Sequence, residues 1–114
     1  MAGPEITIRQ TGGKYSIRAH GAVIGETSRA LILQEGDLAP VLYIPRDDLQ
    51  MVFLDASDHK TICPWKGEAC YFHLAGKSRR EHNVAWSYEN PLPGLADIRD
   101  HLAFHDGVTV EEVS

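Results

Sequence analysis

Short segments in which apolar and polar residues alternate, separated by turn-forming residues, recur along the chain and most constrain its fold. Residues 6–9 alternate in this way before the glycine pair at 12–13, and residues 15–19 alternate before His20-Gly21. A period of two residues places successive side chains on opposite faces of a strand. Many short strands with little helix between them are typical of an all-β sandwich or open barrel.

The rest of the chain predicts further strands and one helix. Leu95, Ile98 and Leu102 fall at helical spacing, which predicts a short C-terminal helix of about two turns. Residues 45–48, which begin with Pro45, predict a tight turn or a single helical turn. The remaining predicted strands cover residues 22–26, 29–34, 41–44, 51–54, 60–63, 68–74, 81–88 and 108–113, with loops at 35–37 and 55–58.

Length and charge limit the classes of function. The 114 residues fit a single domain, residues 1–114, that folds without a disulfide or a metal. The formal net charge is −5, from 16 acidic and 11 basic residues. Nucleic-acid binding relies on cationic side chains, so no nucleic-acid partner is expected. The basic run at residues 77–80 predicts a solvated hairpin tip.

The sequence also predicts a cytoplasmic protein without membrane contact. Its N-terminus lacks the basic and apolar regions of a signal peptide. Apolar runs such as residues 41–44 are far shorter than a membrane span. In the cytoplasm Cys63 and Cys70 are expected to be reduced thiols. Two cysteines alone do not make a structural zinc site, which takes four Cys or His ligands, so no metal or cofactor is expected.

The densest group of chemically active side chains lies between Thr61 and Glu68. A turn with Pro at its start and Gly at its end carries Cys63, Trp65 and Lys66. Such a turn could aim the indole and the ammonium into a cleft, as a stacking face and a cation for an anionic or aromatic ligand. Alternatively, the indole packs over the core edge, the ammonium is solvated, and the thiol is a small buried apolar group.

A second group of aromatic and acidic residues follows in a later predicted strand. Trp86 and Tyr88 share one face of that strand, and Ser87 and Glu89 share the other. Core aromatics with a surface carboxylate are the structural alternative. Glu68 and Glu89 could also meet across strands as a carboxylate pair for acid–base chemistry.

Two other arrangements of residues point more weakly to a catalytic or a metal site. A nucleophilic Cys63 needs a base, which only the fold could supply from His59, His73 or His82. His101 and His105 have the spacing of two ligands on one helix face. The metalloprotease motif, however, needs Glu directly after the first histidine, and Leu102 stands there.

Several stretches with recognisable motifs are spread over nearly the whole chain, at residues 20–25, 28–30, 43–49, 63–69, 71–72, 85–91 and 103–104. Together they resemble the bacterial domain of unknown function 427 family. The resemblance implies a β-tent fold, in which two antiparallel sheets lean together and meet at one edge. Relatives of that general fold bind zinc or small molecules between the sheets, but this chain lacks their paired Cys-x-x-Cys motifs. The family also carries a nucleotidyltransferase label, whose usual Gly-Ser and paired-Asp signature is absent here. Cys70 stands where the family more often has Ser.

Taken together, these features predict a compact two-sheet all-β domain that binds a small polar or anionic metabolite. One alternative is an enzyme acting on a nucleotide or similar metabolite, with Glu68 or Glu89 as base and Lys66 as electrostatic stabiliser. Another is an interaction module whose exposed aromatics bind a protein or a second copy of the chain. The candidate ligand-binding residues are Tyr43, Arg46, Cys63, Trp65, Lys66, Glu68, Trp86, Tyr88 and Glu89.

Overall fold

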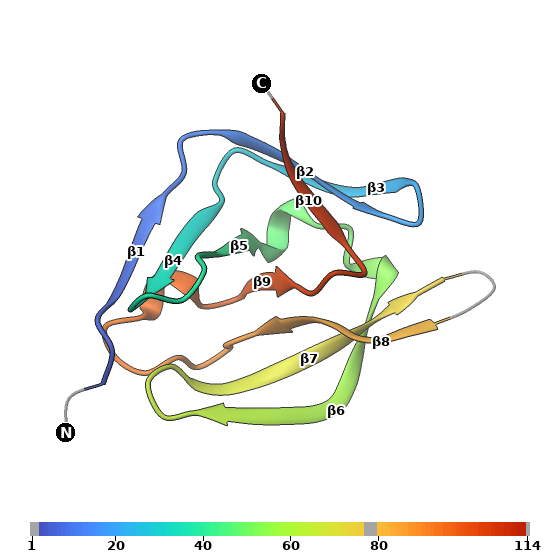
Figure 1. Cartoon of the computed structure of the whole chain (residues 1–114). Coiled ribbons are helices and arrows are strands. Elements are labelled where there is room, and N and C mark those ends of the chain that lie inside the picture. Colours follow the sequence, from blue (N-terminus) through green and yellow to red (C-terminus); the bar gives the residue numbers. More distant parts are fainter. Residues whose placement is uncertain (1–2, 77–79, 114) are drawn as a thin grey trace.

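The computed structural model describes residues 3–76 and 80–113, which form two antiparallel sheets (Figure 1). The prediction of a mainly β fold is confirmed, and the sheets do not close into a barrel. The seven-stranded sheet has the order β1 (Ile6–Gln10), β4 (Leu31–Glu35), β5 (Val41–Pro45), β9 (His101–Phe104), β8 (Arg80–Ser87), β7 (Gly67–Ala75) and β6 (Leu54–Cys63). The three-stranded sheet has the order β10 (Thr109–Val113), β2 (Lys14–Ala19) and β3 (Ala22–Thr27).

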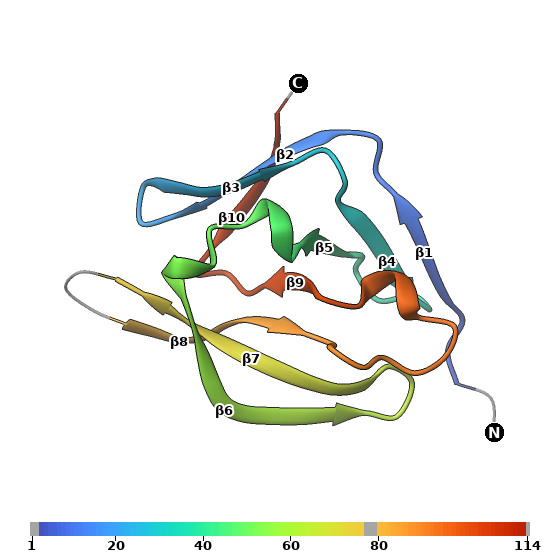
Figure 2. The same ribbon diagram turned by 180° about the vertical axis from the view of Figure 1, so that it is seen from behind.

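The long sheet bends strongly along its width. Figures 1 and 2 show β1 and β4 on one side, β5 and β9 in the middle, and β6, β7 and β8 below them. The three-stranded sheet lies across the opposite end of the molecule from β6 and β7. The radius of gyration is 13.9 Å, close to the value of about 13 Å expected for a compact domain of this length.

The central strands of the long sheet are buried on both faces. Because side chains alternate along a strand, Ile44 and Leu102 enter one core while their neighbours Tyr43 and Ala103 enter another. The first core lies between the two sheets and includes Tyr15, Ile17, Ile24, Phe72, Leu74 and Ala85. The second lies on the other face of the long sheet and includes Leu33, Ala69, Tyr88, Leu95 and Ile98.

The hairpin between β2 and β3 forms where the sequence predicts it. His20 and Gly21 have φ values of 50° and 79°, and Ala19 pairs with Ala22 on either side of them. Two consecutive residues with positive φ make the two-residue turn whose twist matches that of the flanking strands. Glycine adopts this conformation without a steric penalty.

The prediction of a C-terminal helix is wrong. A 3₁₀ turn, η3 (Ala96–Ile98), replaces it, and the chain turns at Asp100 with φ of 57°. Leu102 lies in β9, where it pairs with Ile44 on one side and Ser87 on the other. The apolar spacing therefore reflected burial, whereas the hydrogen bonds of two neighbouring strands fixed the conformation.

Two predictions around residues 51–58 are also wrong. The predicted strand at 51–54 is mostly a 3₁₀ turn, η2 (Met51–Phe53), and the predicted loop at 55–58 belongs to the ten-residue strand β6. Because β6 is an edge strand, its outer side chains meet solvent and polar residues are tolerated there. A register irregularity between Ala56 and Lys60 further disturbs the alternation.

The short turn after β5 forms as predicted. It is the 3₁₀ turn η1 (Arg46–Asp48), a single helical turn. In the predicted basic hairpin tip, residues 77–79 lie outside the described part of the chain, while Arg80 begins β8 and pairs with Asp55 at 2.9 Å. None of the helical segments among the described residues has the length and apolar character needed to span a bilayer.

Candidate functional site

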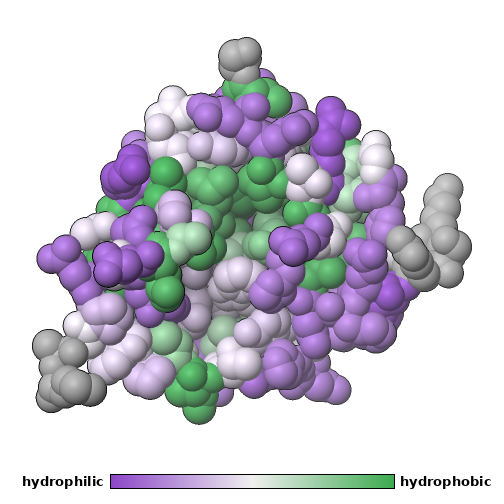
Figure 3. Space-filling view, in the orientation of Figure 1, coloured by the Kyte–Doolittle hydropathy of each residue, from purple (hydrophilic) through white to green (hydrophobic). Residues whose placement is uncertain are grey.

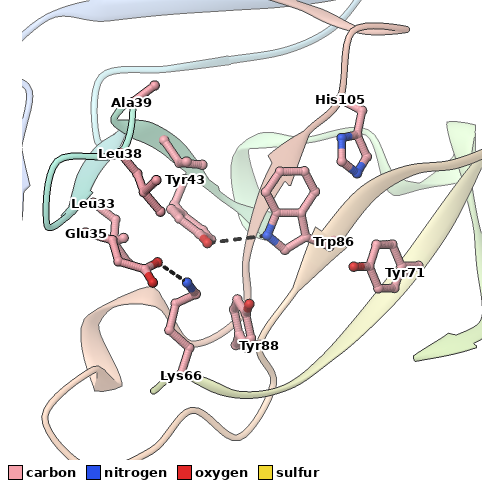
Figure 4. Close-up of a pocket in the computed structure, with 11 residues that line it drawn as sticks. Leu33, Glu35, Leu38, Ala39, Tyr43, Lys66, Tyr71, Trp86, Tyr88 and His105 are labelled. Atoms are coloured by element: carbon pink, nitrogen blue, oxygen red, sulfur yellow. Dashed lines mark hydrogen bonds and ion pairs between the residues drawn. The ribbon is translucent and has the colours of Figure 1, made fainter. Parts of the chain in front are cut away.

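A pocket of about 220 Å³ lies on the face of the long sheet that points away from the three-stranded sheet. Figure 3, in the orientation of Figure 1, shows hydrophobic side chains gathered around a hollow on this side of the molecule. Rings, aliphatic groups and one ion pair form its walls (Figure 4). We call it the aromatic pocket, and its lining residues are Leu33, Glu35, Leu38, Ala39, Val41, Tyr43, Lys66, Tyr71, Trp86, Tyr88 and His105.

The aromatic wall follows from the pairing of neighbouring strands. Trp86 on β8 lies opposite Tyr71 on β7 and opposite Ala103 on β9. Since β9 separates β8 from β5, the small side chain of Ala103 leaves room for Trp86 to reach Tyr43 on β5. The indole Nε1–H donates to the Tyr43 hydroxyl oxygen at 3.3 Å. The ring of His105 lies 4.5 Å from that of Trp86.

Lys66 is positioned by the turn between β6 and β7. The Lys66 backbone N–H donates to the Cys63 carbonyl at 3.2 Å, and its carbonyl accepts from the Leu92 N–H at 2.9 Å. Gly67 follows with φ of 115°, a conformation that L side chains rarely adopt. The Lys66 ammonium then reaches the Glu35 carboxylate and forms an ion pair with it, and these side chains are only 12% and 17% exposed.

Glu35 ends β4, and the loop after it forms the rim of the pocket. The side-chain amide of Gln34 donates to the carbonyl oxygens of Gly36 and Leu38. A backbone hydrogen bond from Leu38 to Glu35 also closes this loop at 3.0 Å. Leu38 and Ala39 are therefore held at the pocket mouth, where the Leu38 side chain remains exposed.

Two of the phenols that line the pocket, Tyr43 and Tyr88, are held in the protonated form. Burial raises the pKa of Tyr43 to about 12 and also raises the pKa of Tyr88. Desolvation penalises a phenolate in each case, so both hydroxyls keep their protons at neutral pH. The ammonium of Lys66 and the carboxylate of Glu35 offset each other's charge. What remains is an aromatic surface with several hydrogen-bond donors at one end.

Four of the nine predicted residues meet in this pocket: Tyr43, Lys66, Trp86 and Tyr88. Trp86 and Tyr88 lie on the same face, and the intervening Ser87 is fully buried. The Lys66 ammonium points inward from its turn, whereas the functional interpretation of the turn placed both the indole and the ammonium in one cleft.

Trp65 does not enter the aromatic pocket. Its side chain is 37% exposed and lies in a separate shallow groove with Pro64 and Leu92. The ring lies so close to Gly3 that a Cβ at that position would collide with it. Consecutive residues of a tight turn point in different directions, which is why Lys66 faces the pocket and its neighbour does not.

The remaining four predicted residues are also placed elsewhere. Arg46 pairs with Glu89 at 3.1 Å and stacks 5.3 Å from the ring centre of Phe72, in the first core. Glu68 is exposed on β7 opposite Ile62. Cys63 is partly buried and packs against the second core. The structure therefore does not bring Glu68 or Glu89 to Lys66 at the pocket.

The three histidines considered as a base for Cys63 make contacts with other rings. His59 stacks on Tyr71 with ring centres 4.6 Å apart, and His73 and His82 contact each other at 4.8 Å. Cys63 and Cys70 are both unlinked, and burial raises the pKa of Cys70. Within residues 3–76 and 80–113, no three Cys, His or acidic side chains are arranged to hold a metal.

Several residues that line the pocket were not predicted from the sequence. Tyr71 falls on the same face of β7 as Ala69, and strand alternation together with the hairpin could have placed it opposite Trp86. Glu35 meets Lys66 across 31 positions of sequence, and no local pattern indicates that contact. The other lining residues that were missed are Leu33, Leu38, Ala39, Val41 and His105.

Comparison with known proteins places the chain in a family without a defined activity. No curated protein matches the sequence. The sequence pattern of the family described as domain of unknown function (DUF427) matches residues 7–114, which include both strands of the β7–β8 hairpin and the Lys66 turn. The chain therefore belongs to the domain of unknown function 427 family.

Proposed function

We propose that this chain is a small-molecule binding domain that takes a polar, ring-bearing metabolite in the aromatic pocket. The observation that carries the proposal is the ion pair of Lys66 and Glu35, which is largely buried at one end of a wall of aromatic rings. Pockets of this kind, mainly apolar with a few polar groups that fix orientation, are the usual form of small-molecule sites.

The position of the ion pair supports a role in ligand recognition rather than in the stability of the fold. Removing two charges from water costs free energy that their mutual attraction offsets only in part, so a buried pair is a poor stabilising device. At a pocket wall, however, both groups can also hydrogen-bond a ligand. The ammonium has three donors and the carboxylate has several acceptor sites, so each has capacity left after pairing.

The size of the pocket limits the ligand. Its volume of about 220 Å³ equals that of about seven water molecules in the liquid. This space suits one substituted ring, which can lie against Trp86 and Tyr88 through offset or edge-to-face contacts.

The alternative functions have less support. An enzyme using Lys66 with Glu68 or Glu89 requires these side chains at one site, and both carboxylates lie outside the pocket. An interaction module requires a continuous apolar surface. The exposed large apolar side chains lie on several elements, and two of them, Trp65 and Leu92, share one shallow groove. The others are Val23, Leu38, Val52 and Ile62.

We also infer that the two sheets adopt the β-tent arrangement implied by the family resemblance. Two antiparallel sheets enclose the first core between them, and this packing supports the inference. The aromatic pocket would then lie on the outer side of the larger sheet, separate from the space between the sheets.

A thermal-shift screen of polar ring metabolites tests the proposed function. A ligand at one hundred times its dissociation constant adds about 2.7 kcal/mol to the free energy of unfolding, which raises Tm by several degrees. Ala39→Phe places a ring at the pocket mouth and should abolish the shift. Ala22→Phe, at an exposed position of the β2–β3 hairpin, is the matched control and should preserve it.

Two results would contradict the proposal. One is the absence of any stabilising compound at millimolar concentration. The other is a set of ligands whose Tm shifts are the same in the Ala39→Phe variant as in the wild-type protein.

A further inference from the structure

The hydrogen bond between Trp86 and Tyr43 has a fixed direction. An indole Nε1–H is a donor and has no acceptor capacity, so the Tyr43 oxygen must be the acceptor at this 3.3 Å contact. The phenolic proton of Tyr43 is then directed away from the indole. It is available to donate to a different acceptor.

The pocket presents this proton together with other donors. In Figure 4 the Tyr43 hydroxyl, the Tyr88 hydroxyl and the Lys66 ammonium lie in the same part of the pocket. The one ionised acceptor of the lining, Glu35, is paired with Lys66. Because burial raises the pKa of Tyr43 to about 12, its hydroxyl remains a donor throughout the neutral range.

The ion pair selects against charged ligands. A carboxylate that binds Lys66, whether beside Glu35 or in its place, leaves two negative charges facing one ammonium. A cation that binds Glu35 leaves two positive charges facing one carboxylate. An uncompensated buried charge costs several kcal/mol. A neutral ligand disturbs neither member of the pair.

We propose that the aromatic pocket selects an uncharged ring compound bearing a carbonyl-type oxygen, and that Tyr43 is the specificity-determining residue that donates to this oxygen. This inference rests on the proposed function, since it names the ligand class of the same pocket. The ring packs against Trp86 and Tyr88, and its oxygen lies at the donor-rich end beside Lys66.

Four simple probes separate the features of such a ligand. Acetophenone is neutral and carries the carbonyl, while α-methylstyrene has nearly the same shape with a methylene in place of the oxygen. Benzoate and benzylammonium present a negative and a positive charge on the same ring. Ligand-observed NMR titrations give the dissociation constant of each probe with the full chain.

Acetophenone should bind most tightly. Its preference over α-methylstyrene should be about threefold to tenfold, the effect of one hydrogen bond between neutral groups. In Tyr43→Phe this ratio should fall to about one, while the binding of α-methylstyrene is retained. Tyr15→Phe removes a hydroxyl from β2 in the first core, outside the pocket, and should leave the ratio at its wild-type value.

The possible results of these titrations contradict the ligand class, the role of Tyr43, the selection against charge, or binding in the pocket altogether. Equal binding of acetophenone and α-methylstyrene by the wild-type protein would overturn the ligand class but leave the pocket as a binding site. An unchanged ratio in Tyr43→Phe would overturn the role of Tyr43. Tighter binding of benzoate or benzylammonium would overturn the selection against charge. Failure of all four probes to bind would overturn both proposals.

Discussion

At the scale of single residues, the polarity of the pocket depends on phenols that keep their protons and on two oppositely charged side chains that form an ion pair. Tyr43 is almost fully buried, and its hydroxyl oxygen accepts from the Trp86 indole. Lys66 and Glu35 neutralise each other at the same end of the cavity. A donor-rich surface results, because burial keeps the proton on the Tyr43 hydroxyl and the ion pair offsets the two charges.

The raised pKa of Tyr43 predicts a loss of stability in alkali. The unfolded chain releases the phenolic proton near pH 10, whereas the folded protein holds it to a pKa of about 12. The folded state therefore binds more protons in this interval, and the free energy of unfolding falls as the pH rises through it, by about 2 to 3 kcal/mol from Tyr43. Urea unfolding between pH 9 and 12 measures this slope.

Tyr43→Phe isolates the contribution of this one group. The variant should show a shallower decline than the wild-type protein, because the buried Tyr88 still contributes in the same direction. Identical slopes for the two proteins would mean that Tyr43 does not retain its proton in the folded state.

At the scale of secondary-structure elements, sequence reasoning succeeds where a local rule determines the outcome. Alternation places Trp86 and Tyr88 on one face, and His20-Gly21 makes the hairpin. Sequence reasoning fails where hydrogen bonding and packing with neighbouring elements determine the conformation. Leu102 has helical spacing but lies between two strands in β9, and the polar residues of β6 form a strand because they lie at the edge of a sheet.

A close contact between β3 and η1 predicts how a substitution at this contact changes the stability of the fold. Gly25 on β3 packs against the end of η1, where an added Cβ would lie 2.6 Å from the Asp48 carbonyl oxygen and 2.8 Å from Leu49 Cδ2. Gly25→Ala should therefore lower the free energy of unfolding by about 1 to 3 kcal/mol, because the backbone must shift. Urea unfolding followed by circular dichroism measures the change.

Gly13→Ala is the matched control for this substitution. Its Cβ would collide with the carboxylate of Glu112, the far end of a flexible side chain that can move aside. The variant should unfold within about 0.5 kcal/mol of the wild-type protein. Equal effects at the two positions would show that β3 does not pack tightly against the turn after β5.

At the scale of the whole molecule, the pocket is assembled from parts that are distant in sequence. The end of β4, the turn after β6 and the strands β5, β7 and β8 each contribute a wall. The turn at residues 63–67 was identifiable because it concentrates reactive residue types, but the direction of Trp65 and the partner of Lys66 depend on the bend of the long sheet. Sequence could therefore indicate part of the candidate site, the turn that carries Lys66, but could not assemble the lining of the pocket.

The two tryptophans allow one experiment to test whether a ligand binds in the aromatic pocket. Trp86 lies in the aromatic pocket, whereas Trp65 lies in a separate groove beside Gly3. The chain contains no other tryptophan, so ¹⁵N-labelled protein gives two indole N–H resonances, which Trp65→Phe assigns. On titration with the most stabilising compound from the thermal-shift screen, the Trp86 resonance should shift and saturate while the Trp65 resonance remains in place. A saturating shift of Trp65 with no change at Trp86 would contradict the account.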